Sequence, residues 1–93
     1  MREALKLTDV TFTPAPPHQR ALGLMGWIQC VAFGWFRLDG LQLRRGEDGR
    51  SIIKFPGKRN ENGWEHALVR PVDANARREI EAELLAQLRA KRQ

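Results

Sequence analysis

The segment LGLMGWIQCVAF, residues 22–33, constrains the architecture more than any other part of the chain. Read as a strand, it alternates its side chains between two faces, and both faces are apolar. Leu24, Ile28 and Cys30 fall on one face, and Met25, Trp27, Val31 and Phe33 fall on the other. Because such a strand must be covered on both sides, one cover is predicted to be a helix. In a chain of 93 residues the other is most economically a second subunit, so the segment predicts a homodimer with Trp27 or its neighbours in the interface.

Four more strands are predicted around this segment, at residues 5–13, 36–45, 50–55 and 64–70. The stretches between them are rich in Pro, Gly and polar residues, which is typical of turns and surface loops: residues 14–19, 33–35, 46–49 and 57–63. Within the strand at 36–45, the apolar phase changes sides at Asp39-Gly40. A β-bulge and a two-residue hairpin turn both explain that change, and we favour the bulge.

A C-terminal helix is the clearest element in the pattern. Asp73 is suited to cap its first turn, because its carboxylate can accept free backbone amides. An apolar stripe then recurs every four residues and predicts the face that packs on the sheet: Ala76, Ile80, Leu84 and Leu88, with Leu85 beside it. The predicted fold class is therefore α+β. We expect residues 1–93 to form one domain, a small antiparallel sheet of about five strands with a C-terminal helix.

The composition narrows the function classes. Apolar residues make up 42% and charged residues 29%, which is typical of a globular chain, and no apolar run reaches the ~18 residues of a membrane span. The first residues lack the apolar stretch of a secretory signal, and the single cysteine excludes an internal disulfide, so the expected location is the cytoplasm.

Residues for catalysis are scarce. The chain has no tyrosine, one serine (Ser51), one cysteine (Cys30), and two histidines, His18 and His66, that are far apart. A nucleophile needs a neighbouring base, and a metal site needs three or four ligands at recognisable spacing, and neither pattern is visible. We therefore predict no enzymatic activity, no metal, no cofactor and no small-molecule substrate.

Positive charge is concentrated in one stretch. Lys and Arg number 16 and Asp and Glu number 11, a net charge of +5. Residues 41–59 contain six cations and two acids, so this stretch carries +4 of that total. The six cations are Arg44, Arg45, Arg50, Lys54, Lys58 and Arg59. Cations grouped in this way attract a polyanion, although a solvated basic hairpin without a partner is the alternative reading.

One local placement favours the polyanion, and a second is compatible with it. Pairing through the 46–49 turn is expected to bring Arg44 or Arg45 close to Arg50, and facing like charges destabilise a sheet unless a phosphate binds them. The helix dipole likewise disfavours Arg77 in the first turns, and either a pair with Glu81 or a nucleic-acid contact would explain it. Trp27, Trp35 and Trp64 could stack on bases, but core or subunit-interface positions are the usual fate of such aromatics.

The ordered set of motifs resembles the stage V sporulation protein G (SpoVG, septation protein) family of small bacterial DNA- and RNA-binding regulators. The matching residues are Leu7-Thr8-Asp9-Val10, Phe36, Leu41-Gln42-Leu43, Gly46, Gly49, the run from Ile53 to Arg59, Gly63, Pro71-Val72, Arg77 and Ile80. The resemblance covers about sixty residues from Phe36 to the helix, whereas residues 14–35 look unlike the family. It implies a β-rich domain with a C-terminal helix, dimerised through exchanged β-hairpin elements.

The sequence thus predicts a cytoplasmic, homodimeric regulator that binds DNA or RNA through the phosphate backbone. The expected contacts come from a basic hairpin, the loop after it and the helix start: Arg44, Arg45, Arg50, Lys54, Lys58, Arg59 and Arg77. The alternative is a dimeric protein-interaction module that does not bind nucleic acid and whose charge serves solubility. No membrane partner is expected.

Overall fold

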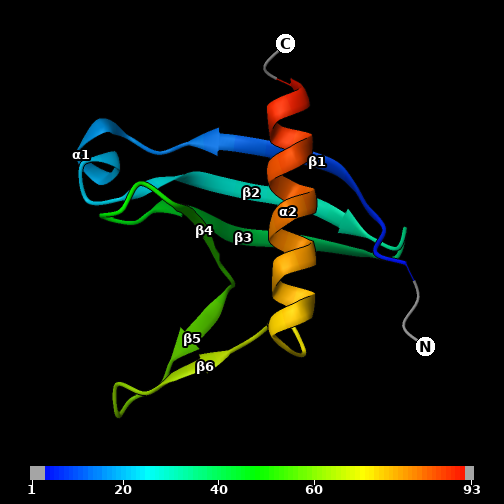
Figure 1. The fold of residues 1–93 in the computed structure, drawn as a ribbon. Coiled ribbons are helices and arrows are strands. Elements are labelled where there is room, and N and C mark those ends of the chain that lie inside the picture. The colour runs from blue at the N-terminus through cyan, green and yellow to red at the C-terminus, as the bar shows by residue number, and fades with distance from the viewer. Residues whose placement is uncertain (1–3, 92–93) are drawn as a thin grey trace.

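Helix α2 crosses one face of a four-stranded antiparallel sheet whose strand order is β1-β2-β3-β4 (Figure 1). The computed structural model describes residues 4–91. Its elements are β1 (Leu7–Pro14), α1 (Pro17–Arg20), β2 (Leu24–Ala32), β3 (Phe36–Arg45), β4 (Ser51–Lys54), β5 (Gly57–Arg59), β6 (Glu65–Ala67) and α2 (Ala74–Lys91). The predicted α+β class is confirmed. No helix within residues 4–91 is long and apolar enough to cross a membrane.

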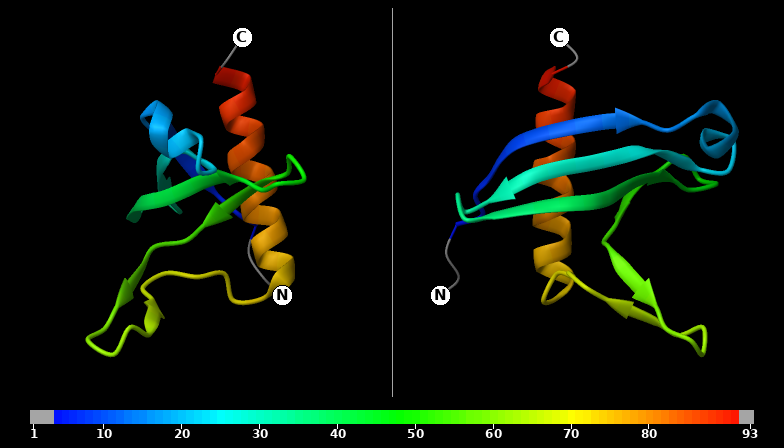
Figure 2. Two further views of the ribbon diagram at one scale, coloured as in Figure 1. Left: turned by 90° about the vertical axis from the view of Figure 1, so that its left-hand side faces the viewer. Right: turned by 180° about the vertical axis from the view of Figure 1, so that it is seen from behind.

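The predicted small antiparallel sheet with a C-terminal helix is confirmed, and its strands are divided between two sheets. Strands β5 and β6 form a separate two-stranded sheet, and the residues expected in a loop at 57–63 supply β5. Pro56 ends the pairing of β4 with β3, because proline cannot donate a ladder hydrogen bond, and the chain turns away from the main sheet there. The β5–β6 hairpin therefore extends beyond the β4 edge of the sheet (Figure 2). The loop predicted at 14–19 likewise contains the short helix α1.

Three register irregularities set which side chains face α2, one between β1 and β2 at Thr8–Thr11 and two between β2 and β3. Ile28 pairs with Leu41 and Cys30 with Leu38, so β3 has one more residue than β2 in that interval. Gly40 lies in this interval with φ of 76°, a conformation that glycine adopts without strain, and the predicted bulge at Asp39-Gly40 is confirmed. The other irregularity of the β2–β3 pairing lies between Leu24 and Gly26 on β2.

The core lies between α2 and the sheet. Leu7, Val10, Ile28, Cys30, Ala32, Leu41, Ile53 and Leu84 form one cluster of buried side chains, and Ile80 and Leu88 pack against it. Leu84 is fully buried and Ala76 is also buried, so the predicted helix stripe faces the sheet. Asp73 Oδ1 accepts a hydrogen bond from the Ala76 amide at 2.8 Å, which confirms the predicted cap.

Side chains of helix α2 form hydrogen bonds with the backbone of both edge strands of the sheet. On the β4 edge, Glu81 Oε2 accepts a hydrogen bond from the Ile53 amide at 2.9 Å, and Arg77 Nη1 donates to the Ile53 carbonyl at 3.2 Å. On the β1 edge, Gln87 Nε2 donates to the Leu7 carbonyl at 2.8 Å. Edge strands expose unpaired backbone groups that attract other strands, so these side chains satisfy groups that the ladder leaves open.

Candidate nucleic-acid interface

The face of the sheet opposite α2 carries no helix over its strands (Figure 2, right). The strand register assigns a continuous row of side chains to this outer face, because directly paired residues point to the same side. Thr13 pairs with Trp27, Trp27 with Gln42, and Gln42 with Lys54, so one row crosses all four strands. Trp27 is half-buried in the middle of that row.

The outer face is polar and basic. Its remaining strand positions, by the same register, are Thr8, Thr11, Gln29, Val31, Arg37, Arg44 and Ile52. Three cations, Arg37, Arg44 and Lys54, therefore share this face. The paired positions assigned to it hold no acid, whereas the exposed acids Asp9 and Asp39 lie in the irregular parts of β1 and β3. Arg44 is held in place, because its Nη1 donates to Gln42 Oε1 at 3.0 Å and its Nη2 to the Leu22 carbonyl at 3.5 Å.

The predicted cations of the β3–β4 hairpin do not all lie on one face. Arg44 and Lys54 are on the outer face, whereas Arg45 follows Leu43 on the face toward α2. Arg50 lies in the turn, where its amide binds Asp48 Oδ1 at 3.0 Å. Arg45 pairs with Ser51 and Arg44 with Ile52, so neither arginine stands opposite Arg50. The register therefore avoids facing like charges in this hairpin, and the predicted approach of Arg44 or Arg45 to Arg50 across the strands is wrong.

Arg77 has a structural role in docking the helix. Besides its bond to the Ile53 carbonyl, its guanidinium carbon lies 5.5 Å from the centre of the Phe55 ring. This cation–π contact and the hydrogen bond to β4 explain an arginine in the first turns of α2. The pairing of Arg77 with Glu81, proposed as one explanation, is replaced by a joint arrangement in which both side chains bind the backbone of Ile53.

The β5–β6 hairpin presents the last two predicted cations. Lys58 pairs with His66 and Arg59 with Glu65 across this hairpin, and both cations are exposed. Asn60 organises the connecting loop, because its Oδ1 accepts hydrogen bonds from the amides of Asn62 and Trp64, each at 3.0 Å. Lys54 Nζ lies 3.8 Å from Glu65 Oε1, so an ion pair links the hairpin to the outer face of β4.

The aromatic residues are distributed differently from the usual expectation. Trp35 is 85% exposed and Trp64 is 71% exposed, so neither belongs to the core of this chain. The segment after the hairpin is also apolar and exposed, with Leu68 at 65% and Val72 at 81%. Cys30 is a buried free thiol, and both histidines are exposed.

Sequence reasoning missed Arg37 as a member of the outer face. Arg37 pairs with Val31, which lies on the same side as Trp27, but the bulge at Asp39-Gly40 separates it in phase from Arg44.

Among residues 4–91, no cluster of three or more His, Cys, Asp or Glu side chains is arranged to hold a metal ion. No protein-family model matches the chain, and no curated protein matches it either.

Proposed function

We propose that this protein is a homodimeric, non-enzymatic regulator that binds DNA or RNA, similar to the septation-protein family. The observation that carries the proposal is the uncovered outer face of the sheet, with Trp27 at its centre and Arg37, Arg44 and Lys54 around it. The hairpin adds Lys58 and Arg59 beyond the β4 edge. The proposed location is the cytoplasm, as predicted from the sequence.

The chemistry of this face suits a nucleic-acid strand. Cations bind phosphates and release counterions, while an aromatic ring offers a stacking surface for a base of any sequence. The threonine and glutamine side chains of the outer face add hydrogen-bonding groups for sugar and base edges. Arg45 and Arg77 face the helix side or bind β4, so we assign the phosphate contacts to the outer face and the hairpin.

The exposed apolar residues support the homodimer. Trp64, Leu68 and Val72 lie in or after the hairpin, and burying such large side chains would release about 1.5–3 kcal/mol each. This differs from the interface predicted at Trp27, which is half-buried on the outer face. The same exposed residues favour the alternative function, a module that binds another protein without nucleic acid.

Fluorescence anisotropy with labelled DNA and RNA oligonucleotides at several salt concentrations tests the binding. The outer-face variant Arg37→Gln with Lys54→Gln removes two phosphate contacts per bound subunit. On duplex DNA the slope of log affinity against log salt should therefore flatten by about 1.8 for each subunit that engages the DNA. The matched control is Arg20→Gln with Arg89→Gln, which removes the same charge outside this face and should leave the slope near that of the wild type.

Equal loss of affinity in both double variants would mean that net charge alone attracts the oligonucleotide, and the proposed face would be wrong. No binding by the wild-type chain at low salt would favour the protein-interaction module instead. Sedimentation at micromolar concentration tests the homodimer separately. We expect a dimer that Trp64→Ser with Leu68→Ser dissociates, and a species of only 10.7 kDa for the wild type would contradict it.

A further inference from the structure

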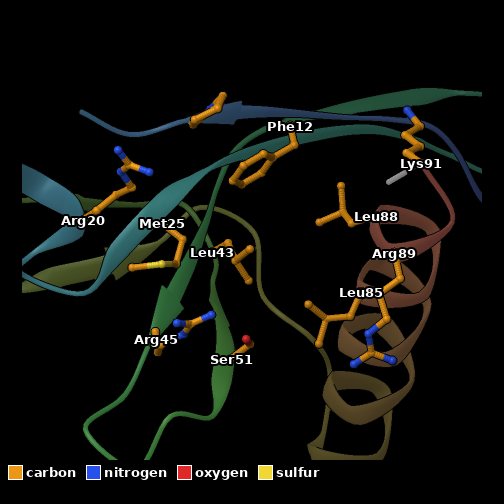
Figure 3. A pocket seen from close by; sticks show the side chains of 11 residues that line it. Phe12, Arg20, Met25, Leu43, Arg45, Ser51, Leu85, Leu88, Arg89 and Lys91 are labelled. Atoms are coloured by element: carbon orange, nitrogen blue, oxygen red, sulfur yellow. The ribbon is translucent and has the colours of Figure 1, made fainter. Parts of the chain in front are cut away.

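A cavity of about 560 Å³ lies between the C-terminal half of α2 and one end of the sheet (Figure 3). This volume is within the ~300–1,000 Å³ that is typical of sites for small molecules. Leu43 and Arg45 line it from the face of β3 that packs toward α2. The cavity is therefore on the side of the sheet away from the proposed nucleic-acid interface.

The walls of the cavity are apolar. Phe12, Met25 and Leu43 come from three adjacent strands, and Leu85 and Leu88 come from α2. All five side chains are half-buried, and Figure 3 shows those of the strands and those of the helix on opposite sides of the cavity.

Two backbone features shape these walls. The irregularity between Leu24 and Gly26 gives β2 an extra residue, Met25, and this side chain lines the cavity on the helix side rather than the outer face. Gly26 leaves room for the Phe12 ring, because a Cβ atom there would lie 2.5 Å from Phe12 Cζ. A larger residue at 26 would force the Phe12 ring out of its position.

The rim of the cavity is cationic. Arg20 from α1, Arg45 from β3, and Arg89 and Lys91 from the last turn of α2 surround the apolar walls. Within residues 4–91, no acidic residue lines the cavity and no ion pair engages any of these four cations. The hydroxyl of Ser51 lies at the same rim and can donate a hydrogen bond.

We infer that this cavity binds a single-chain anionic amphiphile, a long-chain carboxylate whose hydrocarbon tail contacts the five apolar side chains. The carboxylate lies at the rim, where arginine forms charge-assisted and often bidentate hydrogen bonds. Burial of a tail releases about 0.8 kcal/mol per methylene, so affinity is expected to depend on chain length.

A nucleic-acid backbone fits this cavity poorly. Phe12 is the one aromatic side chain in walls that are otherwise leucine and methionine. A phosphodiester has no hydrocarbon to bury against these walls. An inorganic anion would use the rim and leave the apolar walls unfilled. The combination of walls and rim therefore selects a ligand that is anionic at one end and apolar along its length.

Calorimetric titration of the 93-residue chain with decanoate, below the concentration at which decanoate forms micelles, tests this inference. We expect one saturable site per chain and at least tenfold weaker binding of hexanoate and of decyltrimethylammonium. The exposed pair Arg45→Gln with Arg89→Gln should weaken decanoate at least tenfold. The control pair Arg37→Gln with Arg59→Gln removes the same charge elsewhere and should change affinity less than twofold.

Methyl resonances locate the ligand independently of affinity. Decanoate should shift the signals of Met25, Leu85 and Leu88 and leave that of Val31, on the outer face, in place. Equal affinity for decyltrimethylammonium, unchanged binding by the Arg45 and Arg89 variant, or shifts spread over the whole chain would each overturn the inference. Absence of decanoate binding would also overturn the inference. If the variant Arg45→Gln with Arg89→Gln then dissociates into monomers, a second copy of this chain covers the cavity instead.

Discussion

Truncation of Leu84 to alanine should remove a large part of the stability of this domain. Leu84 is fully buried on α2 and belongs to the single cluster that contains Val10, Ile28, Leu41 and Ile53. The substitution removes about three methylene equivalents at about 0.8 kcal/mol each, or about 2.4 kcal/mol of transfer free energy. The space left behind adds a cavity penalty, and buried leucine truncations elsewhere lose about 2.7–5.0 kcal/mol in total.

Thermal unfolding followed by circular dichroism measures this loss. For a domain of this size, each 1 kcal/mol lowers the Tm by about 4–8 °C, so a loss of about 3 kcal/mol corresponds to about 12–24 °C. Leu22→Ala is the matched control, because it makes the same chemical change at a side chain that is 78% exposed. The control should stay within about 0.5 kcal/mol of the wild type.

Both variants must be compared at one chain concentration, because dimerisation would make the Tm depend on concentration. A loss below about 1 kcal/mol for Leu84→Ala would refute the reasoning, since it would mean that α2 contributes little to the core. A loss in Leu22→Ala equal to that in Leu84→Ala would refute it as well, because burial within this chain would then not decide the outcome.

Three further changes test other parts of the fold. Gly26→Ala should destabilise the domain by about 1–3 kcal/mol, because the new Cβ would lie 2.4 Å from the Thr13 carbonyl oxygen, and an unchanged denaturation midpoint would contradict this. Glu81→Ala should cost about 1–3 kcal/mol and speed hydrogen exchange at the Ile53 amide, whereas Glu81→Gln keeps an acceptor and should lose less. Burial, and secondarily the charge of Asp39, raises the pKa of the Cys30 thiol, so the folded chain should react with a thiol reagent far more slowly than the urea-unfolded chain. Because the unfolded chain loses this proton first, stability should fall as the pH rises above the ordinary thiol pKa, and Cys30→Ala should reduce that decline in an alkaline titration of the Tm.

Local patterns in the sequence were sufficient for most of the elements. The strand at 24–32, the turns at 33–35 and 46–49, and the cap and stripe of α2 all depend on residues two to four positions apart. Spacing of this kind is visible without a partner strand, because the backbone geometry of a strand or helix repeats every 2 or 3.6 residues. The bulge at Asp39-Gly40 was predictable for the same reason, since the apolar phase changes there.

Only the tertiary structure decided which side chains share a face. A bulge reverses the phase of everything beyond it, so Arg37 joins the outer face with Arg44, whereas Met25 moves to the helix side. The hydrogen bond from Arg77 to the Ile53 carbonyl joins segments that are far apart in the chain. The β5–β6 hairpin leaves the main sheet at Pro56 and forms a sheet of its own. Such contacts follow from strand register and helix placement, which depend on the packing of the whole core rather than on the spacing of neighbouring residues.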